Sequence, residues 1–169
     1  MTFKESQEKR VETISESLSK FSLALQFDQI PTAVSAQAKL HMLDAIGIGI
    51  ASSSHDFAKK TLHALMSLQE GNDQQYPVLG VPDKLSMRDA ILVNGTFIHG
   101  LDFDDTHAVG VIHASSSANP LSQEEVLRRF GSNVEGVMSH EAANSFTKDF
   151  LKLEHQQSLT NILHQLRVH

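Results

Sequence analysis

The chain has 169 residues, of which 40% are apolar and 20% charged, a composition that suits one compact domain with a hydrophobic core. Its net charge is −6 with Lys and Arg scattered along the chain, which argues against nucleic acid or an anionic membrane as a partner. The absence of cysteine excludes disulfides, thiolate metal sites and a cysteine nucleophile. No apolar run is long enough to span a bilayer and the charged N-terminus lacks a signal-peptide core, so we expect a cytoplasmic protein.

Apolar residues at helical spacing predict two helices at the start of the chain. The first is expected over residues 15–27, ahead of Pro31, because the residue before a proline disfavours helical conformation. The second is expected over residues 32–51. Gly47 and Gly49 on it permit close approach of other backbones at a cost of roughly 1 kcal/mol each, which predicts a tightly packed, buried helix.

A third amphipathic stretch and a longer helix follow. Residues 57–66 carry apolar side chains on one helical face, and residues 71–85 are expected to form a loop with one short extended piece. Ser86 followed by Asp89 resembles a capping box. It predicts the start of a helix whose apolar stripe runs through Leu101.

The C-terminal part of the chain predicts three further helices. Ser122 with Glu125 is a second capping box, opening a short helix that Gly131 is expected to close. Amphipathic runs over residues 146–153 and 159–166 follow. Taken together, these patterns predict an all-α domain of about five to seven helices.

Acidic and imidazole side chains crowd the segment after the helix that is expected to start at Ser86. They are Asp102, Asp104, Asp105, His107 and His113. Like charges this close raise each other's pKa unless something offsets them, and carboxylates at a helix C-terminus meet the unfavourable end of the macrodipole. The segment is therefore either a solvated helix end or half of a functional site.

The spacing of the acidic and histidine residues indicates which of them could act together and whether they could bind a metal. On a helix continuing into it, His99, Asp102 and Thr106 would share one face. A divalent metal is the obvious competitor for such side chains, but the spacing of His99, Asp102, His107 and His113 matches no zinc signature such as H-E-x-x-H. The spacing therefore argues against a metal site at these residues.

Several stretches resemble one known family. NGTFIHGLDFDDTH, followed by a further histidine, resembles the signature of the MmgE/PrpD family, which includes 2-methylcitrate dehydratase, cis-aconitate decarboxylase and iminodisuccinate epimerase. The upstream stretches LHMLDAIGIGIASS and YPVLGVPDKLSMRDAILVNG are similar to that family as well. The chain from NPLSQEEV onward resembles the closing helices of these proteins.

The resemblance implies a particular domain organisation. In the family, N-terminal and C-terminal segments build one helical domain, and an α+β domain is inserted between them. Residues 1–169 would then form a single helical domain, with an N-terminal block at 1–114 and a C-terminal block at 121–169. The junction would lie at about 115–120, the place where the resemblance implies that the inserted domain is missing.

A shared core would be the structural consequence. Because two blocks of one domain must bury their apolar faces together, helices from residues 122–166 are expected to pack against those at 32–51 and 86–101. A C-terminal block detached from the first would remove the interpretation of an excised domain.

The resemblance also implies a site. Asp102, Thr106 and His113 match positions that line the family's pocket, where carboxylate and imidazole are placed for proton transfer beside a substrate carboxylate. The implied chemistry is cofactor-free acid/base work on small di- and tricarboxylic acids, by a dehydratase, decarboxylase or epimerase. A histidine has a pKa suited to such a base. One departure is Ala114, where the family has proline, and this frees the backbone after His113.

Charge predicts that this site is incomplete. A multiply charged acid needs cationic groups to hold it, yet no Lys or Arg lies between Asp89 and Leu127. Arg88 or Arg128 would have to fold back, whereas the family supplies a lysine from the inserted domain. The isolated chain is expected to be inactive, and the residues that choose among the acids would lie in the absent domain.

Two alternatives stay open beside the enzyme. The chain could be a non-catalytic helical dimerisation module, since family members pair through this domain and the glycine-containing helix at 34–51 offers a flat surface. It could also be a His/Asp metal-binding protein. A homodimer is expected in any case, because removing an inserted domain uncovers surface around His113.

Overall fold

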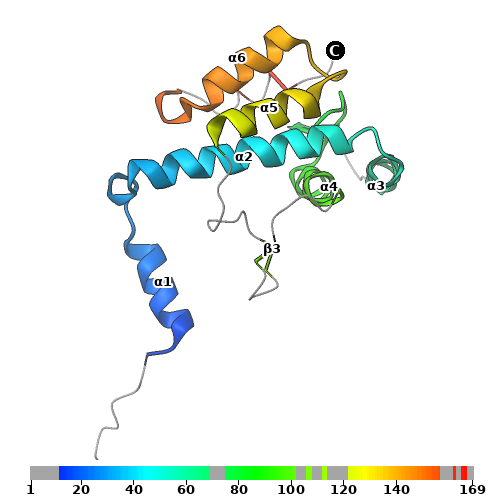
Figure 1. Cartoon of the computed structure of the whole chain (residues 1–169). Helices are drawn as coiled ribbons and strands as arrows, with labels where there is room; N and C mark the ends of the chain where they lie inside the picture. Colours follow the sequence, from blue (N-terminus) through cyan, green and yellow to red (C-terminus); the bar gives the residue numbers. More distant parts are fainter. Residues whose placement is uncertain are drawn as a thin grey trace, which may run out of the picture. The chain divides into compact units, whose positions relative to one another are not determined.

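The structure, a computed structural model, describes residues 12–68, 75–101, 106–107, 112–113, 122–156, 162 and 165–166. Its α-helices are α1 (Ile14–Ala24), α2 (Thr32–Ser52), α3 (Asp56–Ser67), α4 (Met87–His99), α5 (Gln123–Val134) and α6 (His140–Phe150) (Figure 1). Short 3-10 helices are η1 (Phe27–Gln29) and η2 (Leu153–His155). Antiparallel pairs join strands β1 (Tyr76–Pro77) to β2 (Lys84–Leu85) and β3 (Thr106–His107) to β4 (Ile112–His113).

The predicted mainly helical fold is confirmed. Most of the helix expected over residues 159–166 lies outside the described residues. Across the part of the chain that is described, none of the helices is long and apolar enough to cross a membrane. The chain divides into two compact units, Met1–Ser35 and Ala36–His169.

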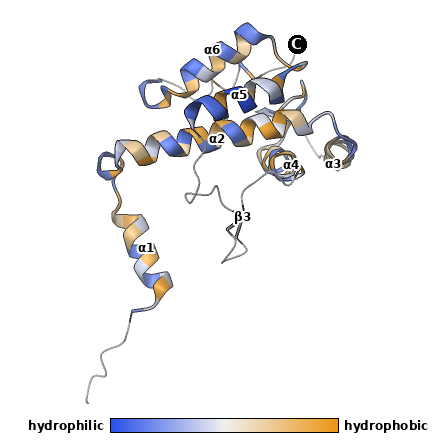
Figure 2. Cartoon of the chain, in the orientation of Figure 1, coloured by the Kyte–Doolittle hydropathy of each residue, from blue (hydrophilic) through white to orange (hydrophobic). Residues whose placement is uncertain are grey.

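The first unit is built around α1, which begins at a capping box. The Thr13 hydroxyl accepts a hydrogen bond from the Glu16 N–H at 3.2 Å, and the Glu16 carboxylate accepts from the Thr13 N–H at 2.9 Å. No residue of α1 is buried, and Ile14 and Leu23 are 80% and 85% exposed. Figure 2 shows hydrophobic, orange segments along α1. The helix ends at Ala24, ahead of Pro31 as expected.

Helix α2 is the centre of the second unit, and its two glycines make close contacts on different sides. A Cβ at Gly47 would lie 3.0 Å from the ring of Phe130 on α5, and one at Gly49 would lie 3.2 Å from Ile98 on α4. Residues two apart on a helix project about 200° apart, so α5 and α4 lie on opposite sides of α2 (Figure 1). The predicted close packing is confirmed. Both glycines pack against other segments of the same chain. They therefore do not provide the flat surface expected for pairing with another copy.

A first core cluster joins α2 to the C-terminal helices. Its buried members are Leu40, Leu43, Ile50, Val126, Phe130, Val134, Ala143, Phe146, Phe150, Ile162 and Leu166. The Phe130 and Phe146 rings stack with centroids 5.6 Å apart. Lys39 of α2 adds a polar link, because its ammonium donates to the Leu151 carbonyl at 2.6 Å and contacts the Glu154 carboxylate at 2.7 Å. The expected packing of the C-terminal block against the helix at 32–51 is confirmed.

A second core cluster covers the other side of α2. Its buried members come from α3, α4 and the β1–β2 segment: Ala58, Leu62, Val78, Leu85, Ala90, Val93 and Phe97. Leu79 packs against both clusters. The structure thus links α4 to the C-terminal helices through α2 and Leu79.

Helix α5 starts where predicted but ends later. The Ser122 hydroxyl accepts from the Glu125 N–H at 3.2 Å, and the Glu125 carboxylate accepts from the Ser122 N–H at 2.9 Å, which completes the expected capping box. Gly131 does not close the helix, which runs to Val134. Because Val134 is buried in the first cluster, the last turn gains apolar contacts that outweigh the cost of an internal glycine.

Candidate active site

The β3–β4 hairpin brings two of the three predicted site residues together. Thr106 lies directly opposite His113, and His107 opposite Ile112. Residues directly opposed in an antiparallel pair have Cα atoms about 4.5–5.5 Å apart. Thr106 and His113 are therefore neighbours at the level of the backbone. Asp102 lies outside the described residues, as do Asp104, Asp105, Ala114 and the junction at 115–120.

Helix α4 leads into the acidic segment and ends earlier than predicted. It stops at His99, and Gly100 caps it by donating its N–H to the Thr96 carbonyl at 2.8 Å. Thr106 lies in a strand, so the shared helical face proposed for His99, Asp102 and Thr106 is wrong. The backbone pairing of Thr106 with His113 replaces it as the relation between site residues.

Helix α3 fixes the point where the chain leaves α4. A Cβ at Gly100 would overlap the ring of Phe57 on α3. That ring also stacks on His55, with centroids 6.0 Å apart. Because only glycine fits at this contact, the acidic segment starts from a defined position against α3.

Arg88, at the other end of α4, is the last Lys or Arg in the sequence before the acidic segment. Arg88 donates from its Nε to the Asp89 carboxylate at 2.8 Å, and the Ser86 hydroxyl donates to the same carboxylate at 2.9 Å. Asp89 is only 2% exposed. Its pKa is lowered, chiefly by the hydrogen bond from Arg88. The predicted cap at Ser86 is thus present, although Asp89 bonds the Ser86 and Arg88 side chains instead of completing a capping box.

That ion pair limits what Arg88 can contribute to the predicted site, which lacks a cation to hold an acidic substrate. Helix α4 has 13 residues, so its first turn is about 20 Å from the end that leads to the hairpin. The guanidinium of Arg88 is engaged by Asp89 at the far end of that helix. Arg88 thus pairs with Asp89 in the first turn of α4, at the opposite end of the helix from the chain that leads to the hairpin.

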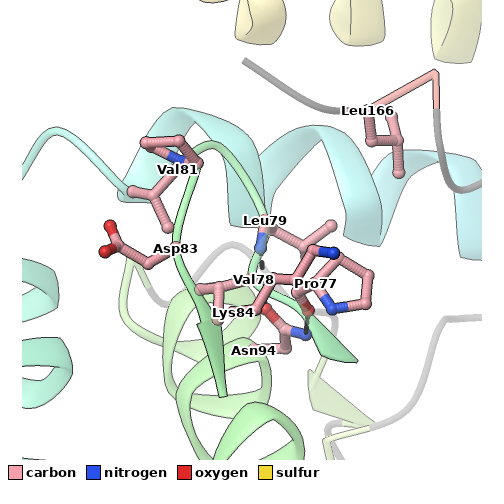
Figure 3. A pocket seen from close by; sticks show the side chains of 9 residues that line it. Pro77, Val78, Leu79, Val81, Asp83, Lys84, Asn94 and Leu166 are labelled. Carbon is pink, nitrogen blue, oxygen red and sulfur yellow. Dashed lines mark hydrogen bonds between the residues drawn. The ribbon is translucent and has the colours of Figure 1, made fainter. Parts of the chain in front are cut away.

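The segment before α4 is held by Asn94, a residue that sequence reasoning missed. Its side-chain oxygen accepts from the Leu79 N–H at 2.9 Å and its amide donates to the Pro77 carbonyl at 3.1 Å (Figure 3). An asparagine inside a helix is unfavourable unless its side chain finds such partners, and this was the signal available in the sequence. Two strands form in this segment where one extended piece was expected.

Next to Asn94 lies a small cavity of about 90 Å³. It is lined by Pro77, Val78, Leu79, Val81, Pro82, Asp83, Lys84, Asn94 and Leu166 (Figure 3). The walls are mainly apolar, both polar groups of the Asn94 side chain bond the backbone, and the charged lining residues are Asp83 and Lys84. Among the described residues, no three His, Asp or Glu side chains gather in a way that could hold a metal ion.

The fold and the site thus define a mainly α-helical domain in which a short hairpin follows helix α4. The MmgE/PrpD N-terminal domain matches residues 16–121, and the chain belongs to the MmgE/PrpD family. Two relatives named cis-aconitate decarboxylase, from Aspergillus terreus and from Aspergillus terreus strain NIH 2624 / FGSC A1156, are each 29% identical over 115 residues.

Those alignments cover 67% of this chain but only 23% of each relative. The chain therefore spans about a quarter of the length of the curated relatives that it matches. No solved structure matches the chain significantly.

Proposed function

We propose that this chain is the helical half of a cytoplasmic MmgE/PrpD enzyme, a lyase or isomerase that performs acid/base chemistry on small di- or tricarboxylic acids without a cofactor. The observation that carries the proposal is the pairing of Thr106 with His113 in a hairpin inside the family-matched segment. A proton-transfer site needs its groups held close together, and a hairpin supplies this through the backbone. The relatives named cis-aconitate decarboxylase support a substrate of this class.

Each residue has a proposed role. His113 is the base that removes a proton alpha to a carboxylate, because an imidazole titrates near neutral pH. Asp102 orients that imidazole or assists it, and Thr106 lines the pocket beside it. Loss of water, loss of CO2 or return of the proton would then complete the dehydratase, decarboxylase or epimerase reaction.

We propose further that half of the site is absent. The segment from residue 90 to 126 has no Lys or Arg, and Arg88 is engaged by Asp89. In the proposed parent enzyme an inserted α+β domain at residues 115–120 supplies the cations. The shared core of α2, α5 and α6 supports this interpretation, since the C-terminal block packs as part of the same domain.

The isolated chain should therefore show no measurable turnover of cis-aconitate, 2-methylcitrate or iminodisuccinate. One charge-assisted hydrogen bond to an anion contributes about 1.5–3 kcal/mol, so the loss of two or three removes several powers of ten in affinity. An NMR titration that follows the His113 ring should show no shift at millimolar acid. Turnover by the isolated chain that disappears in His113→Ala would mean that the site is complete.

A chimera tests the function itself. Residues 115–120 are replaced by the α+β domain that the family resemblance implies for Aspergillus terreus cis-aconitate decarboxylase, and decarboxylation of cis-aconitate is measured. Activity is expected in the chimera, with loss in its His113→Ala variant and retention in His63→Ala, which changes an exposed histidine on α3. A folded chimera that leaves all three acids unchanged would contradict the proposal.

A homodimer, and with it the alternative of a non-catalytic dimerisation module, is favoured by a separate observation. Helix α4 exposes large apolar side chains in the second unit. Surfaces of this kind are commonly covered by a partner. If the chimera is inactive but the chain dimerises, the module is the better description.

A further inference from the structure

Residues of α5 and α6, with Leu151 at the end of α6, line a groove of about 320 Å³. It is called the α5–α6 groove below. The two helices that form it lie side by side (Figure 1). Ligand pockets in proteins commonly begin at about 300 Å³. None of the described lining residues belongs to the β3–β4 hairpin, so the groove shares no residue with the hairpin of the candidate active site.

Gly131 of α5 keeps this groove open. It lies inside the helix, where glycine is less favourable than alanine. A Cβ built there would meet nothing within 4 Å, whereas one at Gly47 of α2 would lie 3.0 Å from the Phe130 ring. Close packing in the described part of the chain therefore explains Gly47 but not Gly131. A residue that weakens its helix without a packing gain is expected at a functional site, and the open space beside Gly131 is the groove that it lines.

The polar side of the groove comes from α6. His140, Asn144 and Lys148 follow one another at intervals of four residues, so they lie along one face of that helix. His140 and Lys148 are the ionisable groups among the described lining residues, which do not include the α6 carboxylates of Glu141 and Asp149. Within the described part of the chain, no ion pair or hydrogen bond holds the Lys148 ammonium. Although the chain has a net charge of −6, the groove therefore presents a cation to a bound anion.

Most of the remaining lining is apolar. It consists of Leu127, Ala143 and Leu151, together with the ring of Phe130. That ring stacks on Phe146 inside the first core cluster, with centroids 5.6 Å apart. Because the aromatic ring is already engaged and the other apolar side chains are aliphatic, the walls suit an alkyl chain better than a second aromatic ring.

We propose that the α5–α6 groove binds an aliphatic carboxylate. The carboxylate accepts hydrogen bonds from the Asn144 amide and the Lys148 ammonium, and the alkyl chain lies over Leu127 and Gly131. Each methylene that is fully buried raises affinity about fourfold, so affinity should grow with chain length. The proposal is independent of the proposed catalytic function, because it uses other residues and a ligand whose main contacts are apolar.

Titration of octanoate into the full chain, followed by ¹H–¹⁵N NMR, tests the proposal. Saturable shifts are expected at the amides of α5 and α6 that line the groove, within a range of up to about 10 mM for a ligand of this size. Octanoate should bind more tightly than hexanoate, and also more tightly than octan-1-ol, which has no charge. Shifts that do not saturate, or equal affinity for octanoate and hexanoate, would overturn the groove as the site.

Filling the groove gives a second test that preserves the fold. Gly131→Leu places a side chain in open space and replaces a poor helix former, so thermal stability should be kept or raised while octanoate binding is lost. Gly131→Ala, which adds one methyl group, should bind octanoate with intermediate affinity. Octanoate binding by a folded Gly131→Leu variant at the wild-type affinity would contradict the proposal.

The role of the charge is tested separately at Lys148. Lys148→Met keeps the length of the side chain and removes its charge. It should weaken octanoate binding about 3- to 10-fold, between the contribution of an exposed ion pair and that of a stronger charge-assisted hydrogen bond, and leave octan-1-ol binding unchanged. Lys60→Met, at an exposed position of α3, is the matched control and should bind both ligands as the wild type does. Equal weakening in the two variants would show that octanoate responds to overall charge and not to this groove.

Discussion

Two glycines have left-handed backbone but differ in what surrounds them. Gly80 has φ 70° in the β1–β2 segment, and Gly136 has φ 82° after α5. A Cβ at Gly80 would collide with the Ser53 side chain and lie 3.0 Å from the Ile50 carbonyl, whereas nothing lies within 4 Å of one at Gly136. The pair therefore separates the cost of backbone conformation from the cost of crowding.

Gly80→Ala should destabilise the fold more than Gly136→Ala. The left-handed conformation costs a side chain about 1–2 kcal/mol at either position, and overpacking adds about 1–3 kcal/mol at Gly80 alone. Urea unfolding followed by circular dichroism measures both. Equal losses in the two variants would mean that the contact of the Gly80 turn with Ser53 relaxes without cost.

Residues at helix starts were more predictable from sequence than those at helix ends. Ser122 with Glu125 predicts the first turn of α5 because the cap is made by the local chain itself. Gly131 was misleading because burial of Val134, a tertiary contact, extends the helix. For the site, Thr106 and His113 came from the family resemblance, and their pairing in a hairpin depends on a backbone register that residue types do not specify.

At the scale of elements, Lys39 of α2 forms an ion pair with Glu154 of η2, which follows α6. The Lys39 ammonium contacts both Glu154 carboxylate oxygens, at 2.9 and 2.7 Å, and also holds the Leu151 carbonyl at 2.6 Å. The hydrogen bond from Lys39 is the main cause that lowers the pKa of Glu154 below its usual range. The link joins the N-terminal and C-terminal blocks of the second unit.

Glu154→Gln should lose part of the acid dependence of stability. The folded-state pKa lies below the unfolded value of about 4.3, so the carboxylate stabilises the fold above that pH and the contribution disappears as pH falls through the folded value. The wild type should exceed the variant in unfolding free energy near pH 6, and the difference should shrink toward pH 3. Glu135→Gln, at the exposed end of α5, is the matched control. A constant difference across this range would show that the effect comes from packing.

At the scale of the whole molecule, the two units differ in how much core they contain. Helix α1 has 11 residues and none is buried, while α5 has 12 and buries Val126, Phe130 and Val134. Helices shorter than about 12–15 residues are marginal in water without tertiary packing. Stability is therefore expected to be distributed unevenly along the chain.

Hydrogen–deuterium exchange should reveal that difference. Amides of α1 are expected to exchange orders of magnitude faster than those of α5, because opening α5 exposes the first core cluster and opening α1 exposes no core of its own. The comparison uses helices of nearly equal length, measured at low protein concentration. Similar protection in both helices would indicate that a partner covers the apolar side of α1.

Both ends of the segment around residues 114–121 are closed by local interactions. Gly100 is seated against Phe57, β3 pairs with β4, and α5 starts from its own capping box at Ser122. Neither end needs the intervening chain to be short. Because loop-closure entropy grows only with the logarithm of loop length, each doubling there costs about 0.6 kcal/mol. We therefore expect this position to accept an inserted reporter or second domain while the helices on either side keep their fold.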